Sequence, residues 1–210
     1  MKQSDRDVLS NYYGSKLKQY GHDTRSLGWI PGGRKARFTA LTCIGDLNGS
    51  KVLDVGCGFG DLYGFLRDLD INVDYTGIDI NPEFIEIAKN TYPEARFIAC
   101  DFDETLLKEE FDWSFAVGIF TIRISDNDLF IKSTLRRMLS VSCKGIAADF
   151  LLPTYSQNDA YWRVEPGELL RFCQTLSRRC AVRCDYKADE YCVYLYKNDK
   201  TDERNLYEHY

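Results

Sequence analysis

The sequence predicts an α/β fold, in which a mostly parallel sheet is covered by helices on both faces. Short apolar runs alternate with helical patterns between residues 51 and 177, as they do in a parallel sheet with crossover helices. The first apolar run leads through a turn with three glycines into a helical pattern. The last two apolar runs are too close together for a crossover helix, so we expect them to pair antiparallel.

The N-terminal part of the chain precedes the sheet. Helical patterns at about residues 5–17 and 34–47 are joined by a turn-rich link. Residues 52–55 then form a short buried strand. Apolar residues at i, i+3, i+4 and i+7 predict a helix over residues 62–69.

The same alternation continues through the middle of the chain. A strand at about 74–80 is followed by a helix that ends near residue 91, with Asn81 as its N-cap and Pro82 in its first turn. Further strands are expected at 96–100, 113–117 and 145–151, helices at 127–141 and 166–177, and a final hairpin over 181–197.

Length and charge limit the protein class. The 210 residues suffice for one domain with a buried core, so we expect a single domain with residues 1–33 as a helical cap on a core of residues 34–210. A net charge of −5 gives no electrostatic basis for wide nucleic-acid binding. The basic segment 171–187 is interpreted as a solvated surface.

Cysteine and histidine usage favours a cytoplasmic protein without a metal. The N-terminus lacks the apolar core of a signal peptide, and the sequence contains no run long enough to span a membrane. The eight cysteines form no C-x-x-C pair, which is typical of reduced, packed thiols. The two histidines, His22 and His209, have no cysteine at ligand spacing.

The glycine turn, Gly56 to Gly60, needs a ligand that its backbone approaches closely. The sequence has no P-loop string, and the spacing G-x-G-x-G departs from the dinucleotide fingerprint G-x-G-x-x-G. Asp79, at the end of the second strand, suits a pair of ribose hydroxyls, which NAD and S-adenosylmethionine both possess. The strand-end acids Asp54, Asp79 and Asp101 suit a cationic cofactor better than a diphosphate.

These motifs resemble those of class I S-adenosylmethionine-dependent methyltransferases, from about residue 34 to the C-terminus. "LDVGCGFG" is similar to the first motif of that family, "GIDI" to its second-strand acid, "CDF" to its adenine-contacting motif and "FDWSFAVGIF" to its fourth-strand motif. The resemblance implies a Rossmann-like sandwich with a seven-stranded sheet of order 3-2-1-4-5-7-6, whose strand 7 is antiparallel.

The resemblance also implies a set of cofactor-binding residues. Gly56, Gly58 and Gly60 would wrap the methionine part of S-adenosylmethionine. Asp79 would hold the ribose, Ile80 would pack on adenine, and Asp101 with the Phe102 backbone would bind the adenine edge. Further candidates are Asp54, which acts on the ligand or on the loop, Cys57 within the turn, Gly118 near the sulfonium, and Arg37 toward the cofactor carboxylate.

Methyl transfer to a nucleophilic oxygen or nitrogen, most simply of a small molecule, is the activity that this resemblance implies. Positioning supplies much of the acceleration, so the sequence need not show a base, and His22 and Tyr155 are weak candidates only. Arg123 and Arg163 are candidates for holding an anionic acceptor. The alternatives are a cofactor-binding module without transfer activity and an NAD-dependent oxidoreductase.

The segment 153–163 follows the fifth strand and borders the expected acceptor side. It is long for a connection and carries Tyr155, Tyr161 and Trp162 among polar residues. We expect this segment, alone or with the N-terminal segment 12–29, to form the acceptor-side wall, and two interpretations remain open. The rings form a mobile lid over the acceptor, or they pack against the N-terminal helices as a fixed cap.

Overall fold

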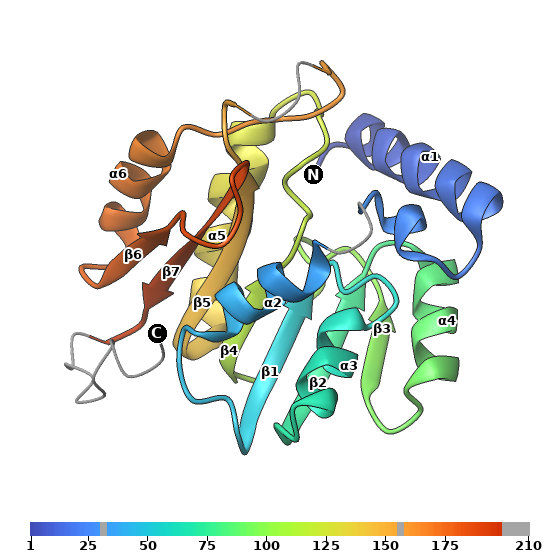
Figure 1. Cartoon of the computed structure of the whole chain (residues 1–210), viewed down its shortest axis with the longest axis horizontal. Coiled ribbons are helices and arrows are strands. Elements are labelled where there is room, and N and C mark those ends of the chain that lie inside the picture. Colours follow the sequence, from blue (N-terminus) through green and yellow to red (C-terminus); the bar gives the residue numbers. More distant parts are fainter. Residues whose placement is uncertain (30–32, 155–157, 199–210) are drawn as a thin grey trace.

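A computed structural model describes residues 1–29, 33–154 and 158–198 of the protein. Its centre is a seven-stranded sheet of order β3-β2-β1-β4-β5-β7-β6 (Figure 1). The strands are β1 Ser50–Val55, β2 Val73–Asp79, β3 Arg96–Ala99, β4 Phe111–Ala116, β5 Ser142–Leu151, β6 Cys180–Arg183 and β7 Glu190–Tyr196. Strand β7 runs antiparallel to both β5 and β6, whereas the first five strands are parallel. The predicted sheet order is confirmed.

Helices cover both faces of the sheet, as the sequence predicts. Apolar residues of α2 (Arg34–Thr42), α3 (Asp61–Asp68) and α4 (Pro82–Thr91) share one buried cluster with side chains of one sheet face. Those of α5 (Asn127–Val141) and α6 (Pro166–Leu176) share a second cluster with the opposite face. In β1, Val52 belongs to the first cluster, and Leu53 and Val55 to the second, as the period of two in a strand requires.

Local sequence signals place several boundaries. Asn81 caps α4 by accepting hydrogen bonds from the N–H groups of Glu83 and Phe84, so the cap predicted there is confirmed. The helical pattern expected over 34–47 ends earlier, because α2 stops at Thr42 and the chain turns toward β1. Strand β5 begins at Ser142, three residues before the expected start, since α5 runs directly into it.

The N-terminal segment lies beyond the carboxyl ends of the parallel strands. Helix α1 (Gln3–Tyr20) and the short 3-10 helix η1 (Thr24–Leu27) pack against each other above α4 and the loops that follow β1, β2 and β4 (Figure 1). This edge of an α/β sheet is where ligands bind. The fold therefore brings residues 1–29 to the place where a site is expected.

Candidate active site

The glycine turn between β1 and α3 has the backbone conformation that the sequence predicts. Gly56, Gly58 and Gly60 all have positive φ, at 74°, 54° and 79°. The N–H groups of Gly56 and Cys57 donate to the carbonyl of Ile78 at 2.7 and 3.0 Å, which fixes the turn against β2. A side chain at any of the three glycines would be strained, because L residues rarely adopt this region.

The three glycines face different surroundings. A Cβ at Gly58 would lie 2.8 Å from Cδ2 of Leu27, under the N-terminal segment. A Cβ at Gly60 would instead lie 2.8 Å from the ring of Phe97, on the side of the sheet core. Gly60 does not line the cavity described next. The structure thus shows a close helix–sheet packing at Gly60 and a close approach of the cap at Gly58.

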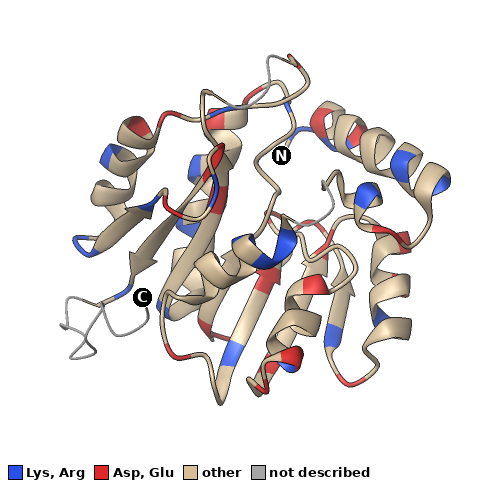
Figure 2. Ribbon diagram, viewed as in Figure 1, with Lys and Arg blue, Asp and Glu red and all other residues tan. Residues whose placement is uncertain are grey.

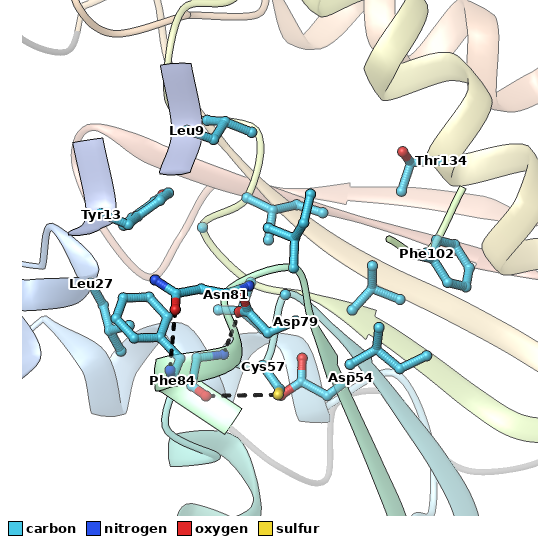
Figure 3. Close-up of a pocket in the computed structure, with 18 of the residues that line it drawn as sticks. Leu9, Tyr13, Leu27, Asp54, Cys57, Asp79, Asn81, Phe84, Phe102 and Thr134 are labelled. Atoms are coloured by element: carbon cyan, nitrogen blue, oxygen red, sulfur yellow. Dashed lines mark hydrogen bonds between the residues drawn. The ribbon is translucent and has the colours of Figure 1, made fainter. Parts of the chain in front are cut away.

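A deep cavity lies above the glycine turn, at the carboxyl ends of β1, β2, β3 and β4. Nine of the eleven residues expected to bind the cofactor line it. They are Asp54, Gly56, Cys57, Gly58, Asp79, Ile80, Asp101, Phe102 and Gly118. Figure 3 shows Leu9 and Tyr13 of α1 on the opposite side of this cavity from Asp54 and Cys57.

Asp79 fastens the glycine turn to the end of β2. Its carboxylate accepts hydrogen bonds from the N–H groups of Gly58 at 2.9 Å and of Asn81 at 2.8 Å. Burial raises the pKa of Asp79 to about 6, and the backbone donors act in the opposite direction. Asp79 therefore holds the loop and borders the cavity at once.

Asp54 is the most isolated carboxylate of the cavity. It is 2% exposed, and its Oδ2 accepts a hydrogen bond of 2.6 Å from the hydroxyl of Tyr75. Its Oδ1 is buried and has no hydrogen-bond partner within the described part of the chain. Burial raises the pKa of Asp54 to about 7, and nearby Asp79 adds to the increase. A buried acceptor without a protein donor is open to a hydrogen bond from a bound ligand or a water.

Helix α1 is tied to the end of β3 by charged groups. Nε of Arg6 lies 2.8 Å from Oδ2 of Asp101, and its guanidinium also contacts Glu104. Asp5 accepts hydrogen bonds from the N–H and the hydroxyl of Ser125, at 2.9 and 2.8 Å. Leu9, Tyr13 and Leu27 complete the apolar roof of the cavity. Sequence analysis missed this roof, although Leu9 and Tyr13 stand four positions apart in the predicted helix.

Arg37 differs from its expected placement. It does not line this cavity, and its guanidinium is 2.9 Å from Oδ2 of Asp149 and bonds to both carboxylate oxygens of Glu190, at 2.9 and 2.5 Å. All three side chains are less than 10% exposed. Oδ1 of Asp149 accepts a 2.6 Å hydrogen bond from the N–H of Gly118. Arg37 is thus linked to the cavity wall only indirectly, through Asp149 and Gly118.

A second, more polar cavity adjoins the first. Leu27, Trp29 and Gly118 line both, so the two meet at the end of β4. The other residues around the second cavity are Tyr12, Gly28, Gly33, Arg34, Arg37, Thr121, Leu151, Tyr161, Lys187 and Glu190. The guanidinium of Arg37 stacks on the Trp29 ring, 5.0 Å from its centroid.

Several acceptor-side candidates lie elsewhere. His22 is exposed, packs edge-on against Phe59 and lines neither of the two cavities. Tyr155 lies outside the described residues. Arg123 donates to the carbonyls of Asp159 and Tyr161, and Arg163 to that of Asn158, so both stabilise the loop itself.

The described part of the loop after β5 is held by backbone hydrogen bonds. The N–H of Trp162 donates to the carbonyl of Thr121 at 2.8 Å, and that of Arg123 to Ala160 at 2.9 Å. The Trp162 ring packs against the core cluster beneath β5 and α6. These contacts favour the fixed-cap interpretation for Trp162. Its ring packs against the sheet core, however, and not against the N-terminal helices.

The described residues show neither a metal-binding cluster nor a membrane-spanning helix. Within residues 1–29, 33–154 and 158–198, no group of three or more His, Cys, Asp or Glu side chains is placed to hold a metal ion. Over the same residues, every helix is too short or too polar to cross a membrane.

Comparisons with known proteins agree on one class. The family model described as "Methyltransferase domain" matches residues 52–142. "Putative methyltransferase Rv1506c" of Mycobacterium tuberculosis is 30% identical over 157 residues, which cover 70% of this chain and 93% of that protein.

Solved structures agree on the fold. Magnesium protoporphyrin IX methyltransferase from Synechocystis PCC 6803 has a TM-score of 0.68 at 13% identity, over 92% of this chain and all of that one. The 1,6-didemethyltoxoflavin-N1-methyltransferase of Burkholderia thailandensis has a TM-score of 0.66 at 17% identity, over 95% of this chain and 92% of that one. Both were crystallised with S-adenosylhomocysteine.

The sheet order, the glycine turn and the acids at three strand ends around one cavity are those of a class I methyltransferase fold. The chain belongs to the methyltransferase family, and its cofactor is S-adenosylmethionine. The expected family, fold and cofactor are thereby confirmed, and the oxidoreductase alternative is dropped.

Proposed function

We propose that the protein transfers the methyl group of S-adenosylmethionine to a nucleophilic oxygen or nitrogen of a small molecule bound in the second cavity. The observation that carries this proposal is the shared wall of the two cavities, formed by Leu27, Trp29 and Gly118. A donor in one cavity and an acceptor in the other would meet at the end of β4. We treat residues 1–33 as the cap that covers both.

The chain's own part in the reaction is mainly positioning. When bound, S-adenosylmethionine supplies an activated methyl group on a sulfonium. The glycine turn and Asp79 would hold the donor, while Thr121 and Tyr161 line the place of the acceptor. Holding both reactants in line accounts for a large part of the rate enhancement, and a base is needed only for an acceptor that must lose a proton.

A small acceptor is supported by the form of the second cavity. It lies between the cap, the start of α2 and the loop after β4, and it has aromatic walls from Tyr12, Trp29 and Tyr161. Its charged groups are paired, because Arg37 and Lys187 contact Glu190 and Arg34 contacts Asp61. Two structural neighbours are named for small organic acceptors, a porphyrin and a toxoflavin precursor.

Charge distribution supports a small molecule over a nucleic acid. Figure 2 shows Lys and Arg spread over several helices and interspersed with Asp and Glu. Wide backbone binding to a nucleic acid needs a continuous basic face. We also propose a cytoplasmic location, because all eight cysteines are free thiols, which suits a reducing compartment.

A pair of substitutions tests the assignment of the two cavities. Leu9 lines only the first cavity and Tyr161 only the second. Once an acceptor is found by screening for release of S-adenosylhomocysteine, Tyr161→Ala should raise the acceptor KM and leave the calorimetric cofactor Kd unchanged. Leu9→Ala should raise the cofactor Kd and have little effect on the acceptor KM. The reverse pattern, or equal effects of both variants, would reject the proposed division.

A further inference from the structure

Five carboxylates line the cofactor cavity, and three of them are already paired with a cation. Asp61 lies 2.5 Å from Nη1 of Arg34, Asp101 lies 2.8 Å from Nε of Arg6, and Asp103 lies 3.5 Å from the amino terminus. The charges of these three groups are largely neutralised by the protein itself.

The other two, Asp54 and Asp79, form no ion pair with any of the described residues. Asp79 is held by backbone N–H groups, and Asp54 by the hydroxyl of Tyr75. Oδ1 of Asp54 lacks any hydrogen bond within the described chain. Both side chains lie in the cavity wall, as Figure 3 shows. When these two groups are ionised, no cation of the described chain balances their charge, and a bound cationic ligand would do so.

The two forms of the cofactor differ in this charge. S-adenosylmethionine has a sulfonium, an ammonium and a carboxylate, which gives it a net charge of +1. In the reaction the S–CH₃ bond breaks, its electron pair stays on sulfur, and the methyl group bonds to the acceptor. The sulfur of the product is a neutral sulfide, and the product as a whole has no net charge.

We propose that Asp54 and Asp79 make the cavity selective for charge, so that it binds the positively charged methyl donor more tightly than the neutral demethylated product. The inference rests on the cofactor role of this cavity and extends it to product release. Transfer of the methyl group removes the ligand's countercharge to the two buried carboxylates. The product is then held less firmly than the donor that replaces it.

The surroundings of the two carboxyl groups give this selectivity a pH dependence. Asp54 is faced by Tyr75 and Asp79 of β2, by Cys57 of the glycine turn and by Asp61 of α3. Burial raises the pKa values of Asp54 and Asp79 to about 7 and about 6, so both are mainly ionised at pH 8 and mainly protonated at pH 5.5. Neither the sulfonium nor the ligand's carboxylate titrates between these pH values.

The Tyr13 hydroxyl of α1 also lies near Asp79 and stays neutral over this range, because burial raises its pKa further above the usual value. Charge selectivity should therefore be strong at pH 8 and weak at pH 5.5. The two aspartates, and not α1, are expected to set this difference.

Titration calorimetry on the full chain tests the proposal with three ligands: S-adenosylmethionine, S-adenosylhomocysteine and sinefungin, an analogue with an ammonium in place of the methylsulfonium. At pH 8 we expect both cationic ligands to bind at least tenfold more tightly than the neutral product. At pH 5.5 this ratio should fall at least threefold. Sinefungin separates the effect of charge from that of the methyl group.

Asp54→Asn is the decisive variant, since asparagine keeps an acceptor for the Tyr75 hydroxyl and removes the charge. It should lower the donor-to-product ratio at pH 8 to about threefold or less. Asp112→Asn is the control for a lost negative charge, because Asp112 pairs with Lys144 and does not line the cavity, and the ratio should stay close to that of the native protein.

Equal binding of donor and product at pH 8, or an unchanged ratio in Asp54→Asn, would overturn the charge selectivity while the cofactor assignment stands. Failure of all three ligands to bind the native chain would overturn both. If Asp54→Asn does not fold, the native protein still decides, since a ratio that is constant between pH 5.5 and 8 contradicts the proposal.

Discussion

Replacement of Arg37 by methionine should destabilise the protein strongly. Methionine fills a similar volume but removes the charge that lies between Asp149 and Glu190, each of which is 1–2% exposed. Lys187 still contacts Glu190 at 2.7 Å, whereas the carboxylate of Asp149 keeps the hydrogen bond from the N–H of Gly118 and has no cation among the described residues. The variant thus leaves Asp149 as a buried carboxylate without a countercharge.

The magnitude follows from the cost of such a charge. Breaking a buried ion pair by removing one partner costs about 3–5 kcal/mol. For a chain of this length each kcal/mol lowers Tm by about 2–4 °C, so the expected decrease in Tm is about 6–20 °C. The same change should weaken cofactor binding, since Asp149 positions the N–H of Gly118 in the cavity wall.

Denaturation by urea and by heat measures the loss, and two further variants define its cause. Arg67→Met is the control, because Arg67 and Glu94 form an ion pair with both side chains about half exposed and should contribute less than about 1 kcal/mol. Adding Asp149→Asn and Glu190→Gln to Arg37→Met should restore much of the stability, since no buried charge then remains uncompensated. A loss below about 1 kcal/mol for Arg37→Met, or no recovery in the triple variant, would refute the reasoning.

Four further predictions concern the cofactor cavity and its surroundings. Gly58→Val should abolish calorimetric binding of S-adenosylmethionine in a folded protein, because the new Cβ would lie 2.8 Å from Leu27 at a φ of +54°; retained affinity would contradict this. Arg6→Met should speed cofactor dissociation about three- to tenfold in stopped-flow measurements, since α1 loses its ion pair with Asp101 at the end of β3. An unchanged rate would show that this ion pair does not retain the cofactor. Trp162→Ala should lower the stability by about 2 kcal/mol and leave cofactor affinity unchanged, whereas an unchanged Tm would favour a mobile lid. The folded-state pKa of Asp54 is raised to about 7, so the native state binds more protons than the unfolded chain, and the ligand-free protein should lose stability as the pH rises from about 4 to 7. Asp54→Asn should flatten this slope and increase the free energy of unfolding at pH 8 by up to about 4 kcal/mol. An unaltered slope would exclude Asp54 as its source.

Features that depend on neighbouring residues could be predicted from the sequence. The cap at Asn81, the proline after it and the positive φ angles of the glycine turn follow from the conformational preferences of those residues. The alternation of apolar runs determined the kinds of elements, and the motif resemblance supplied the order of the strands. These features need no knowledge of distant contacts.

Contacts between segments far apart in the chain could not be predicted from local sequence preferences. Arg37 and Glu190 are 153 positions apart, and a charged residue on a helix does not show which carboxylate it will meet. The glycines of the turn also have different neighbours, which the sequence does not show. A side chain at Gly60 would clash with Phe97 and Tyr92 of the packed core, whereas Gly58 lines the cavity. A glycine pattern reports that space is restricted, and only the fold identifies the neighbour that restricts it.

The buried ion pairs connect the two cavities physically. Gly118 lines both of them, and its N–H is held by Asp149, which in turn is held by Arg37 in the wall of the second cavity. Burial keeps the pKa of Asp149 raised, at about 6, even though Arg37 acts to lower it. Loss of Arg37 would therefore affect the end of β4 from the acceptor side, at the point where donor and acceptor are proposed to meet. The ion pairs around Arg37 are charge-balanced, whereas the wall of the first cavity is not. Substitutions at Arg37 should therefore alter the stability of the protein and the alignment of donor and acceptor. Substitutions at Asp54 should alter the preference between donor and product.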